Sequence, residues 1–294
     1  MDYYRINVLN PAAGQGEAKN ALPETGENYL TSAVGDARRF VAERCKGADG
    51  TLLFCVYGGD GTINEVVAGI LDADAADKAV VSVVPTGTGN DFVRGFSGSP
   101  DQTVPVDVIT CNDSYAVNMI NIGFDCDVVE SAAKMKKLPL IKGSLAYILG
   151  VCDILVHKLG NAVRVTLEDL DGITQSFEQE MLLCDVANGA FCGGGFFAAP
   201  AAKYNDGIID MMLIDKVSRL KFISLVSDYR AGKHVTPDGT VADKFRDIIR
   251  YIRCRKVRIE GIHSFCADGE VFPCDTLEIG VLPGAVRFLR AAGQ

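Results

Sequence analysis

The sequence has little positive charge, no closely spaced cysteine pair and no long apolar run. Its formal net charge is -9, which argues against a nucleic-acid-binding protein because neutralising phosphates requires a positive field. The ten cysteines include no CxxC pair, so they fit neither a zinc site nor a small disulfide framework. We interpret them as reduced, small apolar residues, which are typical of a cytoplasmic protein.

No window approaches the roughly 18 apolar residues of a membrane span, and the amino terminus lacks the pattern of a signal peptide. We therefore expect a cytoplasmic protein, with any membrane contact peripheral and at the inner face of the membrane. The Walker lysine motif and the GxGxxG fingerprint are also absent. The three histidines, His157, His234 and His263, are isolated in the sequence, so we interpret them as surface or packing residues.

The chain has 294 residues, more than the roughly 100 to 200 of one domain, which favours two domains. The first third of the chain alternates strand-like and helix-like segments. This alternation predicts a parallel sheet with right-handed crossovers. The predicted strands are 6–9, 52–57 and 80–84, and the predicted helices are 32–45 and 62–71.

Beyond about residue 104 the pattern changes to many strand-like segments separated by glycine, asparagine and aspartate. This density of strands and turns predicts an antiparallel β-rich domain. The predicted strands are 104–110, 115–122, 162–168, 175–186, 207–214, 256–262 and 277–281, and the predicted helices are 144–156 and 218–229. We also consider that residues 286–289 return to the first domain.

Three glycine- or hydroxyl-rich loops follow the three amino-terminal strands. They are Asn10 to Gly14, Gly58 to Asn64 and Pro85 to Asp91. Because the carboxyl ends of parallel strands meet at one edge of a sheet, we expect the loops to converge there. Glycines let backbone N–H groups approach phosphate oxygens, and the helix starting near Thr62 adds its positive dipole end. Asp60 suits such a site if a divalent cation lies between it and the phosphates.

The motifs GGDGTINEVVAG (58–69), PTGTGNDF (85–92), NPAAG (10–14) and ADGE (267–270) together resemble the diacylglycerol kinase catalytic-domain family, in its soluble bacterial branch. The resemblance covers nearly the whole chain. It implies an α/β parallel-sheet nucleotide-binding domain followed by a β-sandwich-like domain. It also implies ATP and Mg²⁺ as cofactors and a lipid hydroxyl as phosphate acceptor.

The resemblance implies roles for single residues. Glu270 matches the family's general base, and Asp60 lies near the phosphates and the metal. The segment 203–208 matches a magnesium loop, with the Asp206 side chain and the carbonyls of Lys203 and Ile208 as ligands. The implied nucleotide contacts are Asn10, Pro11, Ala12, Ala13, Gly14, Thr31, Gly58, Gly59, Asp60, Gly61, Thr62, Ile63, Asn64 and Thr88.

Two positions depart from the family pattern. Ala13 replaces the usual serine of the first loop, which removes one hydroxyl contact to phosphate. Asn205 replaces the first aspartate of the usual Asp-Asp-Gly in the metal loop, which lowers the local negative charge.

A basic cluster, Lys134 to Lys142, precedes the apolar segment 145–149. This pairing suits docking on anionic lipid, although a solvated helix face is the commoner origin of such a pattern. Both interpretations stay open. The oligomeric state is also open, with a homodimer as one option.

We therefore predict a nucleotide-binding domain of residues 1–120 plus 282–294 and a β-rich domain of 121–281, with the active site between them. The predicted reaction transfers the γ-phosphate of ATP to diacylglycerol, giving phosphatidic acid. An NAD kinase is the nearest alternative, and residues 63–67 with Asp268 to Glu270 favour the lipid kinase. A non-catalytic nucleotide or lipid sensor is the other alternative, which the presence of both Asp60 and Glu270 disfavours.

Overall fold

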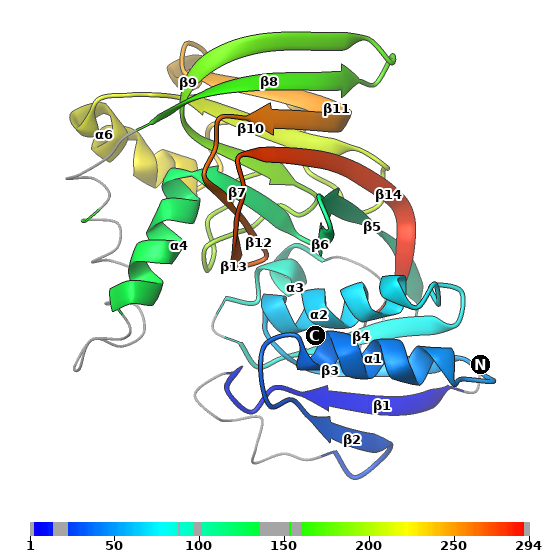
Figure 1. The fold of residues 1–294 in the computed structure, drawn as a ribbon. Coiled ribbons are helices and arrows are strands. Elements are labelled where there is room, and N and C mark those ends of the chain that lie inside the picture. Colours follow the sequence, from blue (N-terminus) through cyan, green and yellow to red (C-terminus); the bar gives the residue numbers. More distant parts are fainter. Residues whose placement is uncertain are drawn as a thin grey trace.

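The computed structural model describes residues 3–13, 23–87, 89–96, 102–135, 153 and 160–290. An α/β part, formed by the first third of the chain, adjoins a larger β-rich part (Figure 1). The elements of the first part are β1 (Tyr4–Leu9), β2 (Glu27–Leu30), α1 (Asp36–Lys46), β3 (Leu52–Gly58), α2 (Asp60–Asp72), β4 (Ala79–Pro85) and α3 (Asp91–Gly95).

The first part is built on four parallel strands in the order β4-β3-β1-β2. Strands β3 and β4 are nearly continuous apolar runs because helices and neighbouring strands bury them on both faces. Helix α2 packs on β3 and β4 and against α1, and its Ile63, Val66, Val67 and Ile70 enter the core. The predicted strands and helices of this part are confirmed.

Two local features differ from the prediction. Helix α1 begins at Asp36 rather than at residue 32, because Gly35 has a left-handed φ of 81° and ends the preceding turn. The Asp36 carboxylate then accepts hydrogen bonds from the Ser32 N–H and hydroxyl. Strand β2 was not predicted, since it has only four residues and alternates half-buried with exposed side chains.

The second part is antiparallel, as predicted. Its strands are β5 (Thr103–Cys111), β6 (Ser114–Ala116), β7 (Met119–Gly123), β8 (Asn161–Asp169), β9 (Thr174–Ala187), β10 (Ile209–Asp215), β11 (Ile249–Glu260), β12 (Ser264–Ala267), β13 (Glu270–Pro273) and β14 (Thr276–Leu289). Its helices are α4 (Phe124–Met135), α6 (Arg219–Arg230) and the short η2 (Asp243–Phe245). One apolar core lies among the strands, and another lies between the sheet and helices α4 and α6.

The predicted strand 115–122 is wrong in one respect, because the chain breaks it into β6 and β7. The backbone N–H groups of Val117, Asn118 and Met119 donate to the Asp268 carboxylate instead of to a neighbouring strand. An acceptor 150 residues away along the chain thus interrupts the ladder, which no local pattern reveals. Helix α4 was likewise not predicted, and the predicted helix 144–156 lies outside the described residues except for Asp153.

Strand β14 joins the two parts into one continuous sheet (Figure 1). Its first half pairs with β11, and residues 287–289 pair in parallel with β4. A register shift between Leu282 and Val286 lets the strand bend between the two directions. Residues 286–289 therefore do return to the first sheet, while the exact domain boundaries stay a prediction. Among the described residues, no helix has the length and apolar character needed to cross a bilayer.

Candidate active site

The three predicted loops meet at one edge of the parallel sheet. The strand register places Leu9 beside Tyr57 and Gly58 beside Pro85, so the residues that follow them are neighbours. The Asn10 side-chain amide donates to the Thr62 hydroxyl at 3.0 Å, which ties the first loop to the second. The Thr86 N–H donates to the Gly58 carbonyl at 3.1 Å, which ties the third loop to the second.

The second and third loops touch through glycine. A Cβ added to Gly87 would lie 2.6 Å from the Cα of Gly59, so a side chain at Gly87 would collide with backbone. Gly59 precedes α2, and among the described residues no side-chain hydrogen bond caps the amino end of that helix. Thr86 Oγ1 and Asn90 Oδ1 are buried and have no hydrogen-bond partner among the described residues. Uncapped helix N–H groups and the Thr86 hydroxyl can donate to phosphate oxygens, whereas Asn90 Oδ1 is an acceptor that suits a hydrogen-bond donor or a cation.

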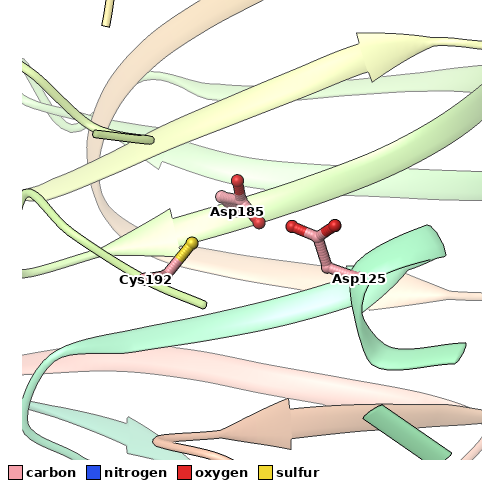
Figure 2. A group of neighbouring side chains, drawn as sticks. All are labelled: Asp125, Asp185 and Cys192. Carbon is pink, nitrogen blue, oxygen red and sulfur yellow. The ribbon is translucent and has the colours of Figure 1, made fainter. Parts of the chain in front are cut away.

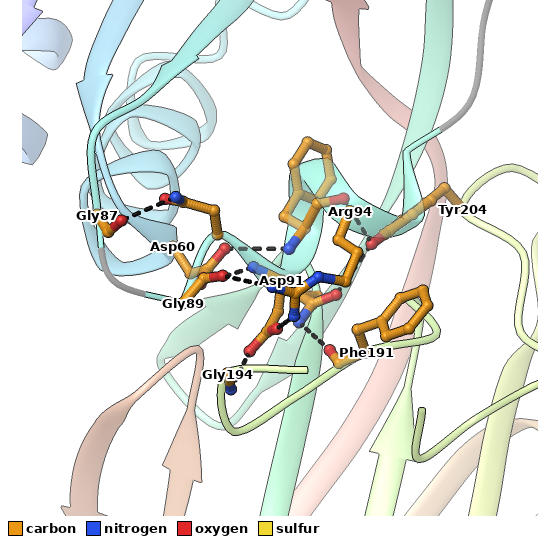
Figure 3. A network of polar contacts seen from close by, with 11 residues as sticks. Asp60, Gly87, Gly89, Asp91, Arg94, Phe191, Gly194 and Tyr204 are labelled. Carbon is orange, nitrogen blue, oxygen red and sulfur yellow. Dashed lines mark hydrogen bonds and ion pairs between the residues drawn. The ribbon is translucent and has the colours of Figure 1, made fainter. Parts of the chain in front are cut away.

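Asp60 holds the third loop in place (Figure 3). Its two carboxylate oxygens accept hydrogen bonds from the backbone N–H groups of Asp91, at 3.1 Å, and Phe92, at 3.0 Å. These groups form the first turn of α3, so Asp60 acts as a cap supplied by another helix. Its predicted role beside phosphates and metal stays a prediction.

Asp91 connects the two parts of the molecule (Figure 3). Its carboxylate accepts hydrogen bonds from Arg94 at 2.7 Å and from the Gly194 N–H at 2.7 Å. Burial raises the pKa of Asp91, which the Gly194 N–H and Arg94 partly oppose. The sequence predicts no individual role for Asp91, although it lies in the Asn90-Asp91-Phe92 motif, because nothing in the sequence indicates that residue 194 comes near it.

Asp268 and Gly269 form the two-residue turn between β12 and β13. Their φ angles of 47° and 93° are those of a tight hairpin in which Asp-Gly is favoured. Four N–H groups donate to the Asp268 carboxylate: those of Val117 at 2.7 Å, Asn118 at 3.1 Å and Met119 at 2.9 Å, and the Asn64 amide at 2.9 Å.

The turn lies close to the amino end of α2. The Asp268 carbonyl oxygen is 4.0 Å from where a Cβ on Gly61 would stand, and the Asn64 amide reaches Asp268 from the next turn of the helix. The NH2 group of Asn64 also donates to the Tyr115 carbonyl, so both of its hydrogen bonds are made within the protein. The predicted nucleotide contact by Asn64 stays a prediction.

Glu270, the predicted general base, is exposed and directly follows this turn. Partial burial raises its pKa, the Glu65 carboxylate raises it further, and Arg38 lowers it. Glu65 itself is anchored, because it accepts hydrogen bonds from the Gly35 and Ala37 N–H groups at the start of α1. A carboxylate with a raised pKa near an uncapped helix end can serve as a base.

A cavity of about 380 Å³ begins at this edge and runs into the β-rich part. Three carboxyl groups, those of Asp60, Asp91 and Asp268, lie in its wall. The wall is otherwise largely apolar, and α4, α6 and strands of the sheet contribute to it. Its larger apolar members are Met119, Phe124, Val129, Leu183, Phe196, Phe222, Ile223 and Val226.

One further carboxyl group, that of Asp125, and the Cys192 thiol lie in the cavity wall, and the Asp185 carboxylate lies beside them (Figure 2). Asp185 is fully buried and accepts hydrogen bonds from the Tyr229 hydroxyl at 2.5 Å and the Asn121 amide at 2.8 Å. Burial raises the pKa of Asp185 to about 6, and burial beside Asp185 raises that of Asp125 well above the ordinary range. Burial likewise raises the pKa of the Cys192 thiol, so the cluster favours its protonated forms.

The predicted magnesium loop, 203–208, lies against β5, because the Asp107 N–H donates to the Tyr204 carbonyl and the Gly207 N–H donates to the Asp107 carboxylate. One oxygen of Asp206 bonds to Arg253 at 2.5 Å, and the other is buried without a hydrogen-bond partner among the described residues. An unpaired carboxylate oxygen fits an oxygen-liganded cation. Arg253 already supplies positive charge to the same carboxylate, so neutralising the loop does not require a metal. The carbonyl ligands assigned to Lys203 and Ile208 stay a prediction.

The remaining predicted contacts fall into three groups. Pro11, Ala12 and Ala13 form the turn after β1, and Thr31 is buried beside it, with its N–H bonded to the Leu9 carbonyl. Ile63 is buried in the core, so only its backbone is available to a ligand. Gly14 and Thr88 lie outside the described residues.

Of the histidines, His234 is buried, with burial lowering its pKa to about 4, and the exposed His263 pairs with Asp127 at 2.8 Å. His157 lies outside the described residues.

Two known domain families match the chain, one in its amino-terminal part and one in its carboxyl-terminal part. The diacylglycerol kinase catalytic domain matches residues 6–122, and the YegS C-terminal NAD kinase beta sandwich-like domain matches residues 118–290. The chain belongs to the family of diacylglycerol kinases and YegS-like lipid kinases. Its fold class is therefore an amino-terminal catalytic domain followed by a β-sandwich-like domain, and its activity class is that of a kinase, which implies the use of ATP.

Individual relatives agree with this assignment. The chain is 26% identical to a diacylglycerol kinase of Bacillus subtilis, over 94% of this chain and 90% of the relative. It is 30% identical to a protein named "Probable lipid kinase YegS-like" from Serratia proteamaculans, over 75% of this chain and 76% of the relative. A crystal structure of a diacylglycerol kinase from Bacillus anthracis superposes with a TM-score of 0.67 at 21% identity, covering 98% of this chain and 97% of that one. That likeness shows the fold.

Proposed function

We propose that this protein transfers the γ-phosphate of ATP to the free hydroxyl of diacylglycerol. The observation that carries the proposal is the cavity, which has carboxyl groups at the glycine loops and an otherwise largely apolar wall. A diacylglycerol molecule is divided in the same way into a polar and an apolar part, because it has a hydroxyl group at one end and two acyl chains. An apolar wall offers little to a water-soluble acceptor such as NAD.

In this proposal the three loops bind the nucleotide. Backbone N–H groups at Gly59 and the start of α2 receive phosphate oxygens, and the unpaired polar atoms of Thr86 and Asn90 are available to the same ligand. Mg²⁺, when bound with ATP, neutralises charge on the transferring phosphate. Asp60 belongs to the second loop and would hold that ion.

The acceptor hydroxyl is activated by Glu270. An alcohol is a weak nucleophile until a base takes its proton, and the raised pKa of Glu270 brings it closer to the working pH. Asp268 fixes the turn that presents this base, because four N–H donors hold its carboxylate. The acyl chains would lie along the apolar wall towards α4 and α6.

A transfer assay tests the proposal. Radiolabelled ATP is incubated with the protein, Mg²⁺ and either dispersed diacylglycerol, other lipid alcohols or NAD, and labelled products are separated. We expect labelled phosphatidic acid. Label on NAD alone, or on no lipid, would overturn the proposal.

The base is tested by Glu270→Gln. We expect turnover to fall by about 10²- to 10⁴-fold, as is usual for a lost general base, while ATP binding is retained. In the unmodified protein, kcat/KM should rise with pH through an apparent pKa above the ordinary glutamate range. Glu43→Gln is the matched control, because Glu43 is an exposed residue of α1. Unchanged turnover in Glu270→Gln would remove Glu270 from the mechanism.

A further inference from the structure

Helix α6 has two apolar faces, and only one of them is buried. The inward face carries Phe222, Leu225, Val226 and Tyr229, which follow the spacing of one helix stripe and pack on the sheet or line the cavity. The outward side carries Leu220, which is 82% exposed, and Ile223, which is 59% exposed. Among the residues that the structure describes outside the first part of the chain, these are the two most exposed large apolar ones.

The outward face is continuous with the cavity. Ile223 belongs to both, because it lines the cavity and is also exposed. Its neighbours along the outward face, Ser224 and Ser227, are exposed and uncharged. An exposed apolar rim therefore surrounds part of the wall along which we have placed the acyl chains.

The segment that carries this rim is rich in basic residues although the protein as a whole is acidic, and one of them, Lys216, pairs with Glu180. Residues 215–233 contain five basic side chains and two acidic ones, in a chain whose net charge is -9. Leu220 stands directly between Arg219 and Lys221, and all three are exposed. Of the two acids, Asp228 is paired with Lys233 and Lys244. Basic side chains beside exposed apolar ones match an anionic lipid surface.

We propose that the outward face of α6, marked by Leu220 and flanked by Arg219 and Lys221, docks on the surface of an anionic bilayer. Docking there brings the cavity mouth to the membrane, so that an acyl-chain acceptor enters from lipid without crossing water. The inference rests on the proposed lipid acceptor, and it names the surface that takes that acceptor from the membrane. It is distinct from the Lys134 to Lys142 cluster, most of which lies outside the described residues.

Vesicle binding tests the surface without any turnover. The full chain is sedimented with large unilamellar vesicles of phosphatidylcholine containing about 30% phosphatidylglycerol, in the absence of ATP. We expect Leu220→Asp to weaken partitioning by about tenfold or more, since one apolar side chain is lost from the lipid and a like charge is added. Lys221→Glu should weaken binding to these vesicles and leave binding to pure phosphatidylcholine unchanged, and raised salt should reduce the difference.

The matched control is Ile173→Asp. Ile173 is 58% exposed at the β8–β9 turn and is not part of the cavity wall, so this variant should bind vesicles as the unmodified chain does. Circular dichroism and thermal unfolding establish that each variant is folded. If Leu220→Asp binds as tightly as Ile173→Asp, the docking surface is refuted. The same conclusion follows if Leu220→Asp is destabilised, because another protein segment then covers the face.

A second assay separates this inference from the proposed function. Phosphate transfer to dioctanoylglycerol in detergent micelles does not require a bilayer, so Leu220→Asp should retain it. If the unmodified protein phosphorylates this lipid but Leu220→Asp still binds vesicles normally, the docking surface fails and the proposed function stands. If vesicle binding depends on Leu220 but no lipid is phosphorylated, the docking surface stands and the proposed function fails.

Discussion

Replacing Asp268 with asparagine should both destabilise the protein and lower its activity. The carboxylate accepts two hydrogen bonds on each oxygen, from Asn118 and Met119 on one and from Val117 and Asn64 on the other. An amide keeps one acceptor oxygen and turns an NH2 group towards the other two donors. Two hydrogen bonds to the carboxylate are lost, each worth about 1.5 to 3 kcal/mol. Burial raises the pKa of Asp268 to about 6, so removing the buried charge offsets part of that loss. We expect a net loss of about 1 to 3 kcal/mol.

Urea unfolding followed by circular dichroism measures this loss, and the transfer assay measures activity. Because the turn presents Glu270, turnover should fall even where the variant is fully folded. Asp275→Asn is the control, since Asp275 is an exposed aspartate just beyond β13 and the substitution is the same. A loss below about 1 kcal/mol together with unchanged turnover would show that the four-donor arrangement does not hold the turn.

Two further variants test the glycine loops and the buried carboxyl pair. Gly87→Ala should raise the ATP dissociation constant at least about tenfold, because the new Cβ would stand 2.6 Å from Gly59 Cα and push the two loops apart. Isothermal titration calorimetry measures this dissociation constant. An unchanged affinity for ATP would contradict the packing of the two loops. Burial raises the pKa of Asp185 to about 6, so the unfolding free energy should fall as pH rises from about 4 to about 6, because over this range the unfolded chain releases a proton that the folded protein still holds. Asp185→Asn should flatten that fall in urea unfolding at a series of pH values, and an equally steep fall would show that Asp185 is not its source.

The sequence was sufficient for features that depend on neighbours in the chain. The apolar runs of β3 and β4, the spacing of α2 and the glycines of the three loops are local patterns, and each predicted its element correctly. The convergence of the loops also followed, because parallel strands necessarily bring their carboxyl ends to one edge. The family resemblance carried by these motifs was confirmed.

The connections between distant segments could not be predicted. Nothing near residue 117 indicates that its N–H donates to Asp268, so the break between β6 and β7 was missed. The hydrogen bond between Asp91 and Gly194 joins residues from different parts of the molecule. Strand β14 likewise joins the sheets of the two parts.

The sequence by itself therefore determined the three glycine loops at one sheet edge and the kinase family, since turn chemistry and glycine conformation depend on consecutive residues. Only the tertiary structure decided what lies beyond that edge. It placed Asp125 beside Asp185, formed the apolar cavity from α4, α6 and the sheet, and left Ile223 exposed in the wall of that cavity. The physical reason is that burial and cavity shape depend on which surfaces pack together, and that packing is set by long-range contacts.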